Sequence, residues 1–203
     1  MYQVILASES PRRKEILEIM GIPYRVAVSQ AEEVTEEKSP ERKVQALAEL
    51  KAEAVYAKIA AKAEDMKERI IIGADTMVFY REHALGKPKD SGDAARMLKL
   101  LSDDVHEVYT GISIIIIDEK GGKEALSFAV GTKVRVRPLT MEQIMDYIAT
   151  GEPLDKAGAY AIQGKFGIFI KEIQGDYYNV VGFPIARIYD TLLMRGIDIK
   201  KLK

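Results

Sequence analysis

Hydrophobic and polar positions along the chain follow two periods, one typical of strands and one typical of helices. Apolar runs rich in β-branched residues predict strands over 2–7, 24–28, 69–80, 106–118 and 124–138, and two more around Gly175-Asp176. The run 69–80, RIIIGADTMVFY, is continuously apolar in most of its length, as in a strand buried on both faces. The runs 106–118 and 124–138 flank Gly121-Gly122, so we expect them to form a hairpin.

Helices are predicted where apolar residues recur at helical spacing. These segments are 11–20, 40–63, 91–101, 141–149 and 184–195. Because strands and helices mix with both crossover and hairpin connections, we expect an α/β fold with a mixed twisted sheet flanked by helices. No linker separates autonomous domains, so residues 1–203 are interpreted as one domain, and the pattern is compatible with two lobes around a cleft.

The composition limits the possible partners and metal sites of the protein more than it limits the possible folds. The chain of 203 residues has a net charge of −1, so no overall bias points to a nucleic acid polymer or a membrane as partner. It has no cysteine and two histidines, which excludes disulfides and thiolate metal sites and leaves oxygen ligands, as for Mg²⁺ or Mn²⁺. No apolar run reaches the roughly 18 residues of a membrane span, and the start MYQVILASES lacks the pattern of a signal peptide. We therefore expect a cytoplasmic protein.

The stretch SESPRRKE, residues 8–15, places positive charge at the start of a predicted helix. Ser10 and Pro11 are typical of the cap and the first helical position, but Arg12, Arg13 and Lys14 have the wrong sign for the helix dipole there. One interpretation is a solvated first turn with outward charges. The other is an anion site, in which free N–H groups and arginine side chains hold a phosphate.

Two charged residues fall at positions where the pattern predicts burial. Lys51 lies seven residues after Val44 and four before Val55, so it shares the apolar stripe of its helix, either with its ammonium extended to water or aimed into a cleft. Asp75 lies inside the buried strand 69–80, where a carboxylate is costly unless it is paired, metal-bound or capping backbone amides. We favour a functional role for Asp75. Lys87, in the nearby turn GKPKD, is either a surface lysine or a third cation for the same ligand.

The stretch 151–167, GEPLDKAGAYAIQGKFG, is rich in glycine, which permits unusual backbone conformations and close approach of a ligand. Gln163 offers an amide that could read the polar edge of a nucleobase. Composition alone is equally compatible with a structural Ω-loop.

Four stretches together resemble the Maf family of nucleotide pyrophosphatases: LASESPRRKEIL, GADTMV, GKPKD and EPLDKAGAYAIQG followed by GDYYNVVGFP, in order from about residue 4 to residue 190. The resemblance implies a fold related to inosine triphosphate pyrophosphatase-like enzymes, an elongated α/β structure with a cleft between two lobes. It also implies hydrolysis of a nucleoside triphosphate to the monophosphate and pyrophosphate with a divalent metal cation, a cytoplasmic location and often a homodimer.

The resemblance also implies roles for individual residues. The phosphate-binding turn would consist of Ser8, Arg12 and Arg13, and the two substrate-binding lysines would be Lys51 and Lys87. Asp75 would be the general base and would share a metal with an essential glutamate, which is Glu32 or Glu33, with Glu33 preferred.

The residues at the family's specificity positions favour one branch. Arg12, Thr76 and Gln163 match the branch that resembles dTTP/UTP pyrophosphatases, so we expect dTTP, UTP or modified pyrimidine nucleotides as substrates. Two alternatives stay open: a nucleotide-binding regulator of septum formation that needs no catalysis, and a triphosphatase for purines such as ITP.

Overall fold

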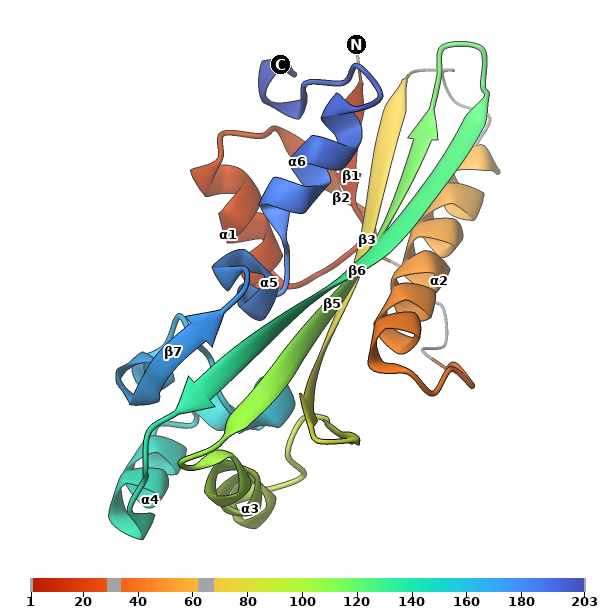
Figure 1. Ribbon diagram of the computed structural model, residues 1–203. Coiled ribbons are helices and arrows are strands. Elements are labelled where there is room, and N and C mark those ends of the chain that lie inside the picture. The colour runs from red at the N-terminus through yellow and green to blue at the C-terminus, as the bar shows by residue number, and fades with distance from the viewer. Residues whose placement is uncertain (1, 29–33, 62–67, 203) are drawn as a thin grey trace. The chain divides into compact units, whose positions relative to one another are not determined.

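The computed structural model describes residues 2–28, 34–61 and 68–202 (Figure 1). Its contacts divide the chain into two compact units. Unit 1 comprises residues 1–75, 110–129 and 182–203, and unit 2 comprises residues 76–109 and 130–181.

The strands form a mixed seven-stranded sheet in the order β2-β1-β3-β5-β6-β7, with β4 paired to β3. They are β1 Gln3–Leu6, β2 Tyr24–Val26, β3 Arg69–Tyr80, β4 His83–Leu85, β5 Val105–Ile117, β6 Lys123–Val136 and β7 Ile170–Gln174. Strand β1 is parallel to β2 and β3, whereas β4 is antiparallel to β3 and β7 is antiparallel to β6. In Figure 1 the arrows of β5 and β6 run in opposite directions, as expected for the predicted hairpin.

The helices flank this sheet, which confirms the predicted α/β class. They are α1 Pro11–Ile19, α2 Pro40–Ala60, α3 Ser91–Leu101, α4 Met141–Ala149, α5 Tyr177–Val181 and α6 Ile185–Leu193, with short 3₁₀ helices η1 Glu152–Asp155, η2 Ala157–Ala159, η3 Lys165–Phe169 and η4 Ile199–Lys201. Within unit 1, Figure 1 shows α2 on one side of the strands and α1 and α6 on the other. Among the described residues, no helix combines the length and the apolar composition that crossing a membrane requires.

Helix α2 packs against the strands of unit 1 at two glycines. A Cβ added at Gly73 on β3 would lie 2.3 Å from the carbonyl oxygen of Ala48, and one added at Gly111 on β5 would lie 2.2 Å from that of Val44. Only glycine therefore lets the helix backbone come so close to the sheet. Gly73 shares its face of β3 with Asp75, because residues two apart point the same way along a strand.

Unit 2 has a separate hydrophobic core. Buried side chains from α3, α4, the strands and the glycine-rich stretch form it, among them Leu98, Val134, Ile144 and Phe166. The rings of Tyr147 and Phe166 lie 5.0 Å apart within this core. The glycine-rich stretch is thus anchored to unit 2 by aromatic packing.

One predicted strand is wrong. After Gly175 the chain forms helix α5 instead of a strand, because Asp176 caps the helix start: its Oδ1 accepts a hydrogen bond from the Tyr178 N–H at 2.7 Å, and its carbonyl accepts one from the Val180 N–H at 3.4 Å. Apolar runs of this length do not distinguish a strand from a short helix.

The remaining differences are at the ends of elements and in loops. Strand β4 was not among the predicted strands, and it pairs with the end of β3. Helix α2 ends at Ala60, and residues 62–63 of the predicted helix lie outside the described residues.

Candidate functional site

The turn between β1 and α1 is held by Ser8. This side chain is buried, and its Oγ accepts a hydrogen bond from the Ser10 N–H at 3.3 Å. Ser10 occupies the cap position of α1 as predicted, but its side chain makes no cap hydrogen bond. The start of α1 therefore depends on Ser8 for its conformation.

Arg13 is buried and joins three segments of unit 1. Its Nη1 donates to Ser8 Oγ at 2.7 Å and to the Ala74 carbonyl at 3.0 Å, and its Nε donates to the Gly182 carbonyl at 2.8 Å. The guanidinium thus ties the first turn to strand β3 and to the segment before α6. The structure places Arg13 in these internal bonds, and its predicted contact with phosphate stays a prediction. Arg12, its neighbour on α1, is only half-buried.

Lys51 and Asp75 form an ion pair within unit 1. The ammonium of Lys51 lies 2.7 Å from Asp75 Oδ1, and their side chains are 13% and 11% exposed. The close packing of α2 at Gly73 brings the helix to the strand at this point. The lysine on the apolar stripe and the carboxylate in the buried strand, which the sequence indicated separately, are therefore partners.

The two arrangements meet on consecutive residues of β3. Arg13 binds the Ala74 carbonyl, and Lys51 binds the side chain of the next residue, Asp75. Unit 1 therefore brings two cations to consecutive residues of β3, one of which carries a carboxylate, and a buried serine is bonded to one of those cations. Such a set can hold a polyanion beside a carboxylate.

The other predicted site residues belong to unit 2. Thr76 is half-buried on β3, whereas Lys87, after β4, and Gln163, between η2 and η3, are exposed. The segments that carry Lys87 and Gln163 are joined, because the Gly158 N–H donates to the Gly86 carbonyl at 3.1 Å.

Gly158 is required at this junction for two reasons. Its φ is +69°, and an added Cβ would lie 3.0 Å from the side chain of Val78. One glycine of the glycine-rich stretch therefore adopts an unusual backbone conformation, as the sequence predicted, and connects the segment of Lys87 with that of Gln163.

Of the predicted metal ligands, Asp75 is the one that lies among the described residues. Glu32 and Glu33, the two candidates for the second acid, lie outside the described residues. In the part of the chain that the structure describes, no three histidine, aspartate or glutamate side chains gather as a metal centre. Mg²⁺ commonly takes one or two carboxylates and completes its shell with water and substrate phosphates, so the Asp75 carboxylate fits that ion.

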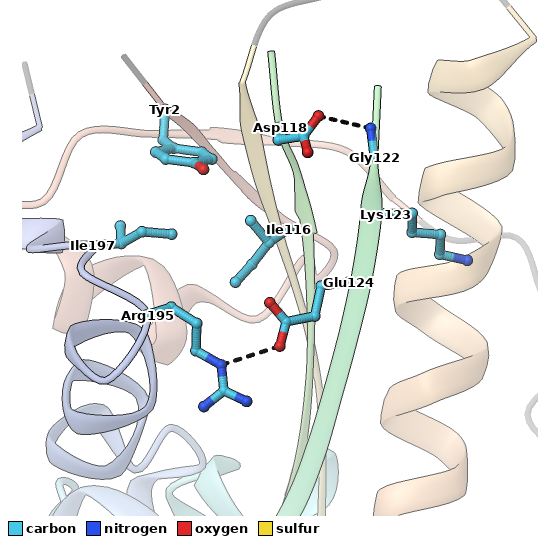
Figure 2. Close-up of a pocket in the computed structure, with 8 residues that line it drawn as sticks. All are labelled: Tyr2, Ile116, Asp118, Gly122, Lys123, Glu124, Arg195 and Ile197. Atoms are coloured by element: carbon cyan, nitrogen blue, oxygen red, sulfur yellow. Dashed lines mark hydrogen bonds and ion pairs between the residues drawn. The ribbon is translucent and has the colours of Figure 1, made fainter. Parts of the chain in front are cut away.

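A pocket of about 270 Å³ in unit 1 contains none of the predicted site residues (Figure 2). Its lining comprises Tyr2, Ile116, Asp118, Gly122, Lys123, Glu124, Arg195 and Ile197. Tyr2 precedes β1, whereas Ser8 follows it, so the pocket lies at the opposite end of that strand. Figure 2 shows Arg195 directed at Glu124, with Nε 3.1 Å from Oε1, so these charges already neutralise each other.

The sequence pattern of the Maf-like protein family matches residues 3–194. The chain belongs to this family. A dTTP/UTP pyrophosphatase of Lachnoclostridium phytofermentans is 50% identical over 201 residues, which are 99% of each chain. A dTTP/UTP pyrophosphatase of Bacillus cereus is 48% identical over 200 residues, 98% of each chain. This Maf-like protein is therefore similar to those relatives along nearly its whole length.

Two solved structures have lower similarity to this Maf-like protein. The Ham1 protein of Staphylococcus aureus has 16% identity and a TM-score of 0.46, covering 95% of this chain and 99% of its own. A nucleoside-triphosphatase, a dITP/XTP pyrophosphatase of Mycobacterium abscessus, has 13% identity and a TM-score of 0.33, covering 68% of this chain and 76% of its own.

Two glycines of the Maf-like protein that shape the site were not among the predicted site residues. Gly182 supplies the carbonyl that binds Arg13, and Gly73 admits the helix that carries Lys51. The signal for Gly73 was a glycine inside a buried strand, which often marks close approach of another backbone. Gly182 lies within the motif GDYYNVVGFP, but nothing in its spacing indicated Arg13 as the partner.

Proposed function

We propose that this Maf-like protein hydrolyses nucleoside triphosphates to the monophosphate and pyrophosphate, with dTTP and UTP as its substrates. The Lys51–Asp75 pair carries the proposal, because its largely buried carboxylate directly follows Ala74, whose carbonyl binds Arg13 from the first turn of α1. The names of relatives about half identical to this chain support the same activity and the same pyrimidine nucleotides.

The chemistry proposed is attack of water on the α-phosphorus. The water oxygen bonds to that phosphorus, the bond from the α-phosphorus to the bridging oxygen breaks, and pyrophosphate leaves with the bonding electrons. Asp75 orients the water and accepts its proton, a role that typically contributes about 10²- to 10⁴-fold in rate. Lys51 holds the Asp75 carboxylate in place through their ion pair and faces the phosphates with a positive charge.

The remaining residues would bind the substrate. Arg12 would contact the phosphates or the base, and Lys87 would add a cation. Thr76 and Gln163 would hydrogen-bond the pyrimidine edge, and a base with the wrong edge would leave those groups unmatched.

A divalent metal, held by Asp75 together with Glu33, would offset the repulsion between the carboxylates and the triphosphate. We also expect the homodimer that the resemblance implies, which analytical ultracentrifugation would test. Neither expectation alters the roles given to Lys51 and Asp75.

A nucleotide panel tests the proposal. The purified protein is incubated with Mg²⁺ or Mn²⁺ and with dTTP, UTP, dCTP, GTP or ITP, and both the monophosphate and pyrophosphate are measured. We expect dTTP and UTP to be hydrolysed with equal yields of the two products. Release of pyrophosphate from neither would refute the proposal, and preference for ITP would favour a purine triphosphatase. Tight binding without turnover would favour the regulator.

A further inference from the structure

Gln163 lies in a short turn, and the backbone conformation of this turn limits the directions in which its side-chain amide can point. The side chain is exposed, and the turn is closed by a hydrogen bond of 3.1 Å from the Gly164 N–H to the Ala161 carbonyl. An exposed glutamine side chain samples many rotamers, so fixing the backbone beneath it limits the positions its amide reaches.

Two side chains of unit 2, Tyr147 on α4 and Glu152 in η1, hold both ends of this turn. The Tyr147 hydroxyl accepts a hydrogen bond from the Ala161 N–H at 3.3 Å and donates to Glu152 Oε1 at 2.8 Å. Glu152 Oε2 accepts a hydrogen bond from the Lys165 N–H at 3.1 Å. The amides on either side of Gln163 are therefore bound to a single tyrosine–carboxylate pair.

The burial of Tyr147 and the absence of a side chain at Gly164 favour the hydrogen bond between Tyr147 and Glu152. Tyr147 is 4% exposed. Burial raises the pKa of its phenol, so the hydroxyl stays protonated and can both donate and accept. A Cβ added at Gly164 would lie 2.1 Å from Glu152 Oε1, so only glycine lets the carboxylate lie against the turn.

We propose that Tyr147 and Glu152 are positioning residues that fix residues 161–165, so that the Gln163 amide meets the pyrimidine edge of the substrate. The inference rests on the proposed function, because it takes Gln163 as a base-reading residue. An amide held in place rejects a base whose hydrogen-bonding edge does not match it. Loosening the pair therefore reduces discrimination between bases more than it reduces attack at the phosphorus.

The test uses Tyr147→Phe, which keeps the ring and removes the hydroxyl. Hydrogen exchange of residues 161–165 is measured in the free protein, and kcat and KM are measured for dTTP and dCTP. We expect faster exchange and a loss of dTTP-over-dCTP selectivity of about tenfold, mainly through KM for dTTP. Adding Gln163→Ala to this variant should cause little further loss of selectivity, because both changes remove the same interaction.

Two more variants separate positioning from general damage. Glu152→Gln leaves one oxygen to accept two hydrogen bonds, so we expect the same direction of change with the phenol intact. Tyr80→Phe is the matched control, because the Tyr80 hydroxyl donates to Asp104 Oδ2 at 2.6 Å elsewhere in unit 2. We expect that control to leave the exchange of 161–165 and the selectivity unchanged.

Each result decides the inference. Faster exchange with lowered selectivity in Tyr147→Phe, and neither in Tyr80→Phe, would support it. Unchanged selectivity in an active Tyr147→Phe enzyme, or an equal loss in Tyr80→Phe, would overturn it while leaving the proposed function intact. A wild-type protein that hydrolyses neither dTTP nor UTP would overturn the proposed function and, with it, this inference.

Discussion

The ammonium of Lys51 lies 2.7 Å from the Oδ1 atom of Asp75, and both side chains are nearly buried. Helix α2 supplies the cation and strand β3 supplies the carboxylate, so the pair forms only because these two elements pack closely together. An ion pair of this kind is sensitive to removal of either partner, since the other charge stays in a poorly hydrated site.

Lys51→Met should lower the free energy of unfolding by roughly 3 kcal/mol, because it removes the cation beside a buried carboxylate. The double variant Lys51→Met/Asp75→Asn should be more stable than the sum of the single changes predicts, since it removes both charges. Urea denaturation of the four proteins measures this coupling, with Lys43→Met on the same helix as control. Strictly additive effects would show that the pair contributes nothing to stability.

Arg12 and Arg13 should respond in opposite ways to substitution. Arg13→Ala removes the donors to Ser8, Ala74 and Gly182, and we expect a loss of about 3 kcal/mol in the free energy of unfolding. Arg12→Ala should leave stability nearly unchanged and raise KM for dTTP about tenfold or more, as expected for a lost arginine–phosphate contact. Thermal denaturation and steady-state kinetics on both variants distinguish these roles. A KM effect without a stability effect in Arg13→Ala would contradict the assignment.

Gly73→Ala should displace Lys51 from Asp75 by changing how α2 packs against β3. The added methyl group would lie 2.3 Å from the Ala48 carbonyl, so α2 must move away from β3 and carry Lys51 with it. We expect a loss of roughly 2–3 kcal/mol in unfolding free energy, together with reduced turnover. Gly86→Ala is the stability control, because nothing lies within 4 Å of its added Cβ. Equal stability of the two variants would argue against the close packing.

Stability should fall on acidification between about pH 6.5 and pH 4. Burial lowers the pKa of His106 from 6.5 to about 4, so in this range the unfolded chain binds a proton that the folded protein does not. The contribution is on the order of 3 kcal/mol, present above the unfolded pKa and lost as the pH falls. Denaturation midpoints across this range measure it.

His106→Gln should flatten the pH dependence, and an unchanged slope in that variant would refute the assignment. The carboxyl of Asp104, whose pKa is lowered by the hydrogen bond from Tyr80, acts at lower pH. Its stabilisation is lost only below about pH 4, the pKa of an unfolded aspartate, so Asp104 adds little to the slope above pH 4.

Much of the fold follows from local sequence pattern. The buried strand β3, the apolar stripe of α2 and the hairpin of β5 and β6 were predicted, because periodicity within each segment determines which face is buried. The same reasoning indicated Lys51 and Asp75, since each places a charge where the pattern requires burial.

The rest of the site depends on contacts between distant segments. Arg13 was expected to face a ligand, and its bond to Gly182 joins residues 169 positions apart, which no local pattern reveals. The bonds from Tyr147 and Glu152 to the Gln163 turn were likewise unexpected. The segment of α5 was predicted as a strand because of its apolar run. It forms a helix because the capping by Asp176 outweighs that run.

The role of Asp75 is tested by comparing dTTP binding and dTTP hydrolysis in the wild-type protein and in Asp75→Asn. We expect the wild type to release pyrophosphate and dTMP in equal amounts, and Asp75→Asn to fold and bind dTTP but turn it over roughly 100-fold more slowly or worse. Near-native release of pyrophosphate by a folded Asp75→Asn variant would contradict the proposal that Asp75 activates the attacking water.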